Sequence, residues 1–191
     1  MRVGVFALQG DVREHIRTLT SMGVESLEVR NAADLASVDG LILPGGESTT
    51  ISKLIDIFSL RKTLSDFISL GKPVFGTCAG MIMLAKEVLD AASGQRSLEA
   101  MDISVRRNAF GSQLDSFETE IEFDGKPATV AFIRAPIVER VGAGVEVLSK
   151  LPNGAVVAVR SGNLLATAFH PELTGDNSVH EYFVAMVSKS L

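Results

Sequence analysis

The chain has 191 residues, of which 46% are hydrophobic and 21% are charged, and it carries a formal net charge of −5. This composition is typical of a globular protein, and we expect residues 1–191 to form a single domain. Lys and Arg form no cluster, which argues against a nucleic-acid surface because phosphates are neutralised by grouped cations.

The only cysteine cannot form an internal disulfide, and no apolar stretch has the length of a secretory signal or a membrane span. We therefore expect a cytoplasmic protein, without membrane contact, whose partners are small molecules or other proteins.

In the first half of the chain, strand-like apolar runs alternate with segments of helical periodicity. The strand-like runs are RVGVFAL, VESLEVR, GLIL and PVFGT, and the helical segments are DVREHIRTLTSMG and ISKLIDIFSLRKTLSDFISLG. Strands separated by helices of this length form βαβ units, which favour a parallel sheet covered by helices on both faces.

The second half is richer in strand-like segments, separated by Gly, Pro and Asn turn signals. These segments are DISVRRN, FETEIEF, ATVAFI, VEVLSK, AVVAVRSG and NLLATAF, and we expect some of them to pair antiparallel. A last helix is predicted to begin with a capping box of Ser178 and Glu181 and to place Val179, Phe183 and Met186 on the face that packs on the sheet. The prediction is an α/β fold of three α/β/α layers, with a mostly parallel central sheet and antiparallel additions.

Cys78 lies in the segment GTCAG, between a strand and a helix. The G-x-C-x-G pattern is the thiol form of the nucleophile elbow, whose sharp turn needs residues without Cβ at Gly76 and Gly80. The N-terminus of the following helix would favour the thiolate. A buried, inert cysteine is the alternative, and it is the more common state of a lone thiol.

A thiolate acyl-transfer enzyme also needs a base and a group that orients the base. His170 and Glu172 follow the predicted strand NLLATAF, and Pro171 between them favours an extended His170. Side chains at i and i+2 of an extended segment point the same way, so Glu172 can hold the imidazole. A solvated strand-end turn is the alternative. His15 and His180 fit the role of base less well.

The segment LPGGESTT follows another strand and opens a helix. Backbone N–H groups at Gly46 and at Ala79, the residue after the cysteine, could form an oxyanion hole, although a simple turn is the alternative for the two glycines. Arg106, Arg107 and Arg134 are candidates to bind a substrate carboxylate or, alternatively, to form surface salt bridges. One cysteine and three dispersed histidines show no metal-ligand spacing, so we expect no metal.

The motifs PGGES, GTCAG and HPE, in this order, resemble those of the class I glutamine amidotransferases, which carry a Cys-His-Glu triad. A finer resemblance covers essentially the whole chain and is specific. The segments LQGDVREH, LPGGESTT, GTCAGMIMLAKE, RRNAFGSQLDSFE, FIRAP and FHPELT are similar to those of the glutaminase subunits of pyridoxal 5'-phosphate synthases. The segment DAASGQRSLEAMD matches no motif of that family.

The resemblance implies a class I glutamine amidotransferase-like (flavodoxin-like) fold and a glutaminase with the catalytic triad Cys78, His170 and Glu172. Cys78 would attack the side-chain amide of L-glutamine, and His170, oriented by Glu172, would move the protons. By motif, the glutamine-binding positions are Gly46, Glu47, Ser48, Arg107, Ile133 and Arg134, with Arg107 preferred to Arg106.

The resemblance also implies a partner, the (β/α)8-barrel synthase subunit of a larger hetero-oligomer, which would use the ammonia to make pyridoxal 5'-phosphate. This chain would need no cofactor. We hypothesise that docking completes the oxyanion hole near Gly46 and that Gln9 takes part in that change. Two rival hypotheses remain, a related triad hydrolase acting on another amide and a catalytically silent docking module.

Overall fold

The computed structural model describes residues 1–107 and 116–191. Within these ranges the principal sheet has the strand order β2-β1-β3-β4-β12-β11-β9-β6-β5, with β10 paired to β11. Its strands are β1 (Arg2–Phe6), β2 (Glu25–Val29), β3 (Gly40–Leu43), β4 (Val74–Thr77), β5 (Ala85–Val88), β6 (Met101–Arg106), β9 (Ile137–Val141), β10 (Glu146–Lys150), β11 (Val156–Ser161) and β12 (Leu164–Thr167).

The sheet divides into a parallel part and a mostly antiparallel part. Neighbouring strands run parallel from β2 through β1, β3 and β4 to β12. From β12 the sheet continues antiparallel through β11, β9 and β6 and ends with the parallel pair of β6 and β5. Every residue of β3, β4 and β12 is buried, as expected for parallel strands that are covered on both faces.

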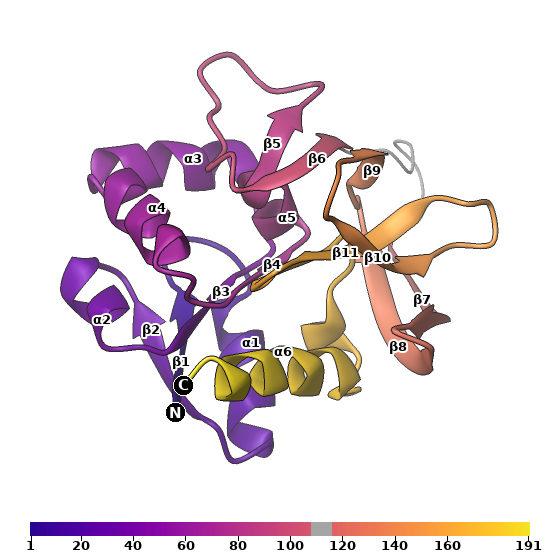
Figure 1. The fold of residues 1–191 in the computed structure, drawn as a ribbon, viewed down its shortest axis with the longest axis horizontal. Helices are drawn as coiled ribbons and strands as arrows, with labels where there is room; N and C mark the ends of the chain where they lie inside the picture. Colours follow the sequence, from indigo (N-terminus) through magenta and orange to yellow (C-terminus); the bar gives the residue numbers. More distant parts are fainter. Residues whose placement is uncertain (108–115) are drawn as a thin grey trace.

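Helices cover both faces of the parallel part (Figure 1). Helices α1 (Val12–Ser21) and α6 (Ser178–Lys189) lie on one side, and α3 (Ser48–Ile57), α4 (Arg61–Ser69) and α5 (Ala79–Leu84) lie on the other. The short helix α2 (Ala32–Ala36) connects β2 to β3, and a 3-10 turn, η1 (Pro171–Leu173), follows β12. This arrangement confirms the predicted three-layer α/β fold.

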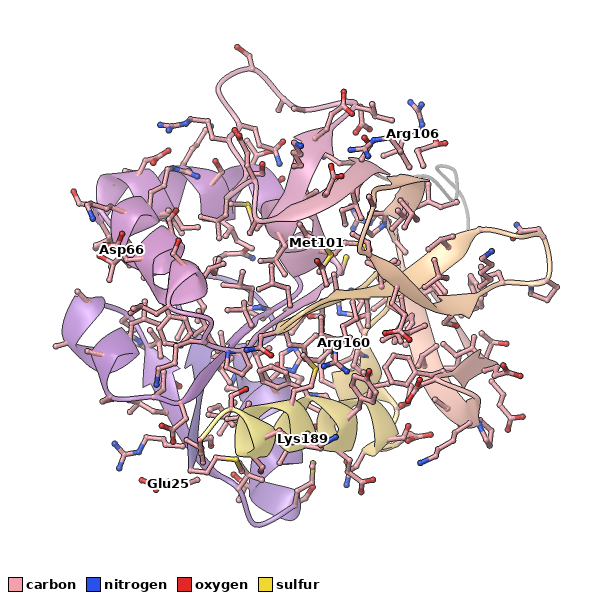
Figure 2. All side chains as sticks on the ribbon, in the orientation of Figure 1. Glu25, Asp66, Met101, Arg106, Arg160 and Lys189 are labelled. Carbon is pink, nitrogen blue, oxygen red and sulfur yellow. The ribbon has the colours of Figure 1, made fainter. Side chains whose placement is uncertain are left out.

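The burial of side chains follows this arrangement of sheet and helices. Met101, near the centre of the view in Figure 2, is fully buried, whereas Asp66 and Arg106 lie near the edge of the molecule and Lys189 is exposed on α6. Val179, Phe183 and Met186 on α6 are buried, as the spacing predicts. Each such side chain contributes about 1.5–3 kcal/mol through the hydrophobic effect. Among the described helices, none combines the length and the apolarity that a membrane span requires.

Strands β7 (Ser116–Phe123) and β8 (Lys126–Ile133) form a separate antiparallel hairpin. The chain reverses at Asp124 and Gly125, which both have positive φ, the backbone required by the tightest hairpin turns. The bridge between Ala131 of β8 and His170 joins this hairpin to the end of the parallel sheet.

The structure differs from the sequence-based expectations in three local features. The single helical segment expected over 51–71 is divided into α3 and α4, because Ser59 adopts a left-handed φ of 55°. The predicted capping box is wrong, since Asn177 is the N-cap residue and makes no side-chain cap bond. Instead, the Asp176 carboxylate accepts hydrogen bonds from both the backbone N–H and the hydroxyl of Ser178. Helix α2 and strands β5 and β9 were not predicted.

Candidate active site

The candidate site lies at the carboxyl ends of the parallel strands. Asp11 follows β1, Gly46 follows β3, Cys78 follows β4 and His170 follows β12. Because parallel strands all end at the same edge of a sheet, segments that are far apart in the sequence meet there, which is where open α/β sheets bind ligands.

Cys78 occupies a strained turn between β4 and α5. Its φ of 46° and ψ of −101° belong to a region that residues with a side chain rarely adopt. The Cys78 N–H donates to the carbonyl oxygen of Thr167 at 2.8 Å, which fixes the turn against β12. The cysteine side chain is buried but lines the cavity described below.

Both glycines of the motif are required by close backbone contacts. A Cβ on Gly76 would lie 2.5 Å from the carbonyl carbon and oxygen of Gly80. A Cβ on Gly80 would lie 2.0 Å from the carbonyl oxygen of Leu43 in β3. The elbow is thus packed directly on the sheet, and no side chain fits at either position, as the G-x-C-x-G pattern predicts.

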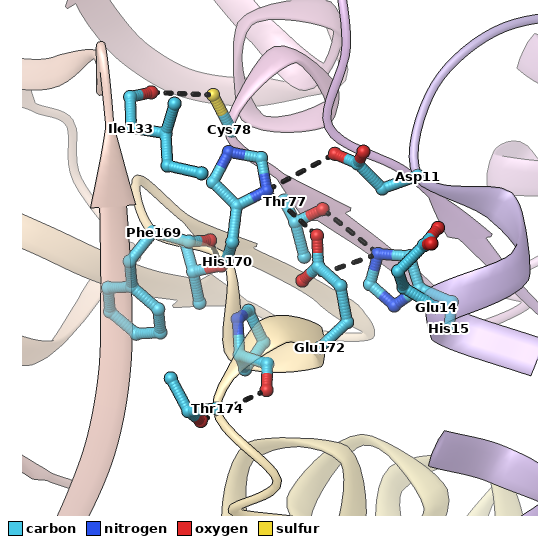
Figure 3. A network of polar contacts seen from close by, with 12 residues as sticks. Asp11, Glu14, His15, Thr77, Cys78, Ile133, Phe169, His170, Glu172 and Thr174 are labelled. Atoms are coloured by element: carbon cyan, nitrogen blue, oxygen red, sulfur yellow. Dashed lines mark hydrogen bonds and ion pairs between the residues drawn. The ribbon is translucent and has the colours of Figure 1, made fainter. Parts of the chain in front are cut away.

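His170 and Glu172 meet at the end of β12 (Figure 3). The distance from His170 Nδ1 to Glu172 Oε1 is 2.8 Å, and both residues are buried. The backbone N–H of His170 donates to the Ala131 carbonyl at 2.7 Å, so the β7–β8 hairpin positions the histidine. His170 is extended as predicted, whereas Glu172 lies in the 3-10 turn, because Pro171 at its start has the φ of a helical residue.

The polar groups around His170 favour its charged form. Burial lowers the pKa of this imidazole, but hydrogen bonds with Asp11, Cys78 and Glu172 outweigh the burial and raise the pKa to about 12. Burial raises the pKa of Glu172, and the hydrogen bond with His170 partly offsets that rise. A proton on His170 Nδ1 is therefore retained by the ring and directed at the carboxylate.

Asp11 is a second carboxylate at this imidazole that the sequence reasoning missed. Its Oδ2 lies 3.3 Å from His170 Nδ1, and Figure 3 shows it approaching the ring from the end of β1. Its position gives a signal that could have been used, because it lies at the carboxyl end of a strand within the parallel part of the sheet.

The loop after β3 approaches the cysteine. Glu47 is the N-cap of α3, and its carboxylate accepts hydrogen bonds from the backbone N–H groups of Thr49 and Thr50 at 3.0 and 2.6 Å. Burial raises the pKa of Glu47, but these bonds and one from the Thr50 hydroxyl lower it to about 2. The Glu47 backbone N–H donates to Gln9 Oε1 at 2.9 Å, so Gln9 holds the loop.

A cavity of about 510 Å³ opens above the thiol. It brings together the predicted oxyanion-hole and glutamine-binding positions with two members of the triad, Cys78 and His170. The lining residues are Asp11, Gly46, Glu47, Ser48, Cys78, Ala79, Ile82, Arg107, Ile133, Arg134 and His170. Glu172 lies behind His170, and the thiol of Cys78 is 4.0 Å from the Ile133 carbonyl oxygen.

The two neighbouring arginines have different surroundings. Arg107 lines the cavity and donates to Gln95 Oε1 at 2.7 Å, while Arg106 forms an exposed ion pair with Glu139 at 2.7 Å. Gln95 also donates to Ser48 Oγ at 3.0 Å. Gln95, in the segment DAASGQRSLEAMD, therefore forms hydrogen bonds with two residues that line the cavity, Arg107 and Ser48. The following motif residues, Asn108 to Gly111, lie outside the described part of the chain.

A family model described as the SNO glutamine amidotransferase family matches residues 5–189. The chain belongs to this family. Proteins named pyridoxal 5'-phosphate synthase subunit PdxT from Dehalococcoides mccartyi and Frankia alni are 57% and 55% identical to this amidotransferase. These matches cover 97% and 99% of this chain and 97% and 96% of the relatives.

A crystal structure of a glutamine amidotransferase shares 45% sequence identity with this chain and superposes with a TM-score of 0.92, over 97% of this chain and 98% of that one. A putative GMP synthase subunit from Thermoplasma acidophilum is 17% identical with a TM-score of 0.67, which is a similarity of fold alone.

Within the described ranges of this amidotransferase, Asp11, His170 and Glu172 form a group whose potential metal-ligand atoms lie within 4.8 Å of one another. In the arrangement seen here, Asp11 and Glu172 both direct an oxygen at His170 Nδ1. The three residues therefore form a hydrogen-bonded unit that orients an imidazole. Their geometry favours general acid-base chemistry.

Proposed function

We propose that this glutamine amidotransferase hydrolyses L-glutamine to L-glutamate and ammonia through a γ-glutamyl thioester on Cys78. The observation that carries the proposal is the convergence of three groups in one cavity. Cys78 lies on a strained elbow, His170 lies beside it, and Glu172 binds the far nitrogen of His170 at 2.8 Å. This is the arrangement that nucleophilic acyl transfer needs.

In the first step, the Cys78 sulfur attacks the side-chain carbonyl carbon of glutamine. His170, which its surroundings keep charged, already holds the thiol proton and donates it to the departing amide nitrogen, so that ammonia leaves and the thioester forms. In the second step, the neutral His170 takes a proton from water, the hydroxide attacks the thioester, and the thiolate leaves beside the recharged imidazole as glutamate is released. Glu172 keeps Nδ1 protonated and directs the other ring nitrogen at the sulfur.

Both steps place negative charge on the carbonyl oxygen, which backbone donors can stabilise. We assign this role to the N–H groups of Ala79, at the start of α5, and of Gly46, after β3, because both residues line the cavity beside Cys78. Glu47, Ser48, Arg107, Ile133 and Arg134 are assigned to glutamine binding for the same reason. The guanidinium groups suit the α-carboxylate, whereas the Glu47 carboxylate is engaged in capping α3.

The ammonia has a defined destination in this proposal. The relatives named pyridoxal 5'-phosphate synthase subunit PdxT match nearly the full chain. We infer that this chain is the glutaminase subunit of such a synthase and passes ammonia to a (β/α)8-barrel synthase subunit in a larger hetero-oligomer. Direct transfer is favourable because ammonia that reaches water is largely protonated and is no longer a nucleophile. Residues 1–191 would act as one domain without a cofactor.

Docking of the synthase subunit is proposed to complete the oxyanion hole. Gly46 has a φ of 154°, a backbone conformation that L side chains rarely adopt, and its neighbour Glu47 is tied to Gln9. A partner that changes the Gln9 contact would therefore reorient the Gly46 N–H. Because the chain relies on a free thiol, we further propose a reducing compartment, the cytoplasm.

The test is glutamate release from glutamine by the purified chain, with and without the synthase subunit, using Cys78→Ala as the control. The proposal expects release that is stimulated by the partner and absent in the variant. Equal release with and without the partner would refute the docking effect alone. Absence of release with a folded protein and an authentic partner would refute the glutaminase and favour a silent docking module.

A further inference from the structure

Two buried histidines lie behind Glu172, on the side away from His170. His15 comes from α1 and His180 from α6, and both are fully buried. His15 Nε2 lies 3.6 Å from Glu172 Oε2 and 3.2 Å from Thr77 Oγ1. Both contacts are drawn as dashed lines in Figure 3. His15 Nδ1 lies 2.9 Å from His180 Nε2. The row of neighbouring polar side chains at the site thus extends from His170 through Glu172 to His15 on α1 and His180 on α6.

The second carboxylate oxygen of Glu172 suggests a role for these two histidines at the site. Among the residues that the structure describes, Glu172 Oε2 is buried without a hydrogen-bond partner, and so is His180 Nδ1. A buried, unpaired carboxylate oxygen is costly. The His15 Nε2 atom lies just beyond hydrogen-bond distance from it, so a small movement of either side chain would bring the two into contact.

The ring nitrogens that carry the protons of His15 and His180 can be assigned by elimination. Burial lowers the pKa of His15 and of His180, so each ring carries a single proton near neutral pH. If His15 donated from Nδ1, its bare Nε2 lone pair would face the Glu172 carboxylate, and His180 would bury an unpaired Nδ1–H. If His180 donates from Nε2 instead, His15 carries its proton on Nε2, directed at Thr77 and Glu172, and only a bare acceptor on His180 stays unpaired. The second arrangement is favoured.

We propose that His15 is a positioning residue of the triad, whose Nε2–H holds the second oxygen of Glu172 while His180 fixes the His15 tautomer. This inference rests on the proposed glutaminase reaction, in which Glu172 has to present one oxygen to His170 Nδ1 at every step. A donor at Oε2 fixes the rotamer of the carboxylate and stabilises its charge when His170 becomes an imidazolium. The simpler interpretation, two core histidines that satisfy each other, leaves Glu172 Oε2 without a donor.

Two substitutions at one position separate these interpretations. The amide nitrogen of Gln can occupy the place of His Nε2, whereas the amide of Asn reaches only the place of Nδ1. His15→Gln therefore keeps a donor toward Glu172, and His15→Asn keeps a contact toward His180 and loses that donor. In glutamate release by the complex with the synthase subunit, we expect His15→Asn to lower kcat about tenfold with unchanged KM, and His15→Gln to stay within about threefold of the parent.

A second measurement does not depend on glutamine turnover. The His170 Nδ1 proton, held in a short hydrogen bond to Glu172, is observable by NMR in the free chain. We expect its resonance to persist in His15→Gln and to shift or disappear in His15→Asn. If the parent chain released no glutamate, the glutaminase proposal would fail while this NMR comparison still decided the role of His15.

The inference would be overturned if the two variants had equal kcat values and an unchanged resonance. It would also be overturned if both variants lost kcat equally and in step with a loss of thermal stability. If His15→Asn does not fold, the pair His180→Gln and His180→Asn repeats the test one step farther from the triad. Gln keeps the donor to His15 Nδ1 and Asn removes it, so only the Asn variant is expected to lower kcat. Equal kcat values in this second pair would likewise contradict the proposal.

Discussion

Replacement of Cys78 by Gly and by Ala offers a direct test of the strained elbow. Both variants lose the thiol, so they differ in backbone freedom and in one methyl group. A side chain held at φ 46° and ψ −101° costs about 1–3 kcal/mol, which glycine does not incur. Glycine loses about 0.5–1 kcal/mol more than alanine through chain entropy. The two ranges differ by about 0–2.5 kcal/mol, so we expect Cys78→Gly to be more stable than Cys78→Ala by about 1 kcal/mol.

The assay is urea unfolding at equilibrium, which gives the free energy of unfolding of each variant. Ala185→Gly is the matched control, because Ala185 is exposed within helix α6, where glycine is less favourable than alanine by about 1 kcal/mol. The order of stability should thus be reversed between the two positions. If Ala were the more stable residue at both positions, the elbow would not be strained and the argument for an activated thiol would lose its structural basis.

Three further predictions concern the surroundings of the elbow. Gly80→Ala places a Cβ 2.0 Å from the Leu43 carbonyl oxygen, so urea unfolding should show a loss of about 3 kcal/mol; a change within error would contradict the packing described. His180 has a pKa lowered by burial from 6.5 to about 4, so the unfolded chain binds its proton first on acidification. Stability should fall by about 3 kcal/mol between about pH 7 and pH 4, and His180→Gln should remove this part of the fall. Asp11→Asn removes a hydrogen-bonded carboxylate and should lower the pKa of His170, which NMR titration of the ring measures; an unchanged midpoint would exclude the interaction.

The regular parts of the fold could be predicted because their residues carry strong local signals. The runs GLIL and PVFGT are apolar throughout, and each becomes a buried strand of the parallel sheet. The elements that escaped prediction have weaker signals. Strand β5 (Ala85–Val88) carries two charged residues and is formed by pairing with β6, a contact across a long loop that no local pattern encodes.

The candidate site shows the same division between local and long-range information. Cys78 and its glycines form one short motif, and the neighbouring pair His170 and Glu172 forms another. Asp11 and His15 reach the same place only because α1 packs beside the end of β12, and neither residue has a recognisable partner in the sequence. Their contacts could be found only once the sheet order was known.

The capping box illustrates the opposite error, a local pattern that tertiary structure overrides. Ser178 and Glu181 have the correct spacing, but Asp176 accepts both hydrogen bonds from Ser178 and shifts the N-cap to Asn177. The Asp176 carboxylate takes the Ser178 N–H that the Glu181 carboxylate would accept in a capping box, and it also takes the Ser178 hydroxyl as a donor.

The central claim is that glutamine hydrolysis passes through a thioester on Cys78, and trapping that intermediate tests it most directly. The complex with the synthase subunit would be quenched with acid during turnover of glutamine and analysed by peptide mass spectrometry. The account predicts a glutamyl group on the peptide that contains Cys78, removable by hydroxylamine and absent in Cys78→Ala. A glutamyl group on another residue, or glutamate release that continues in Cys78→Ala, would contradict it.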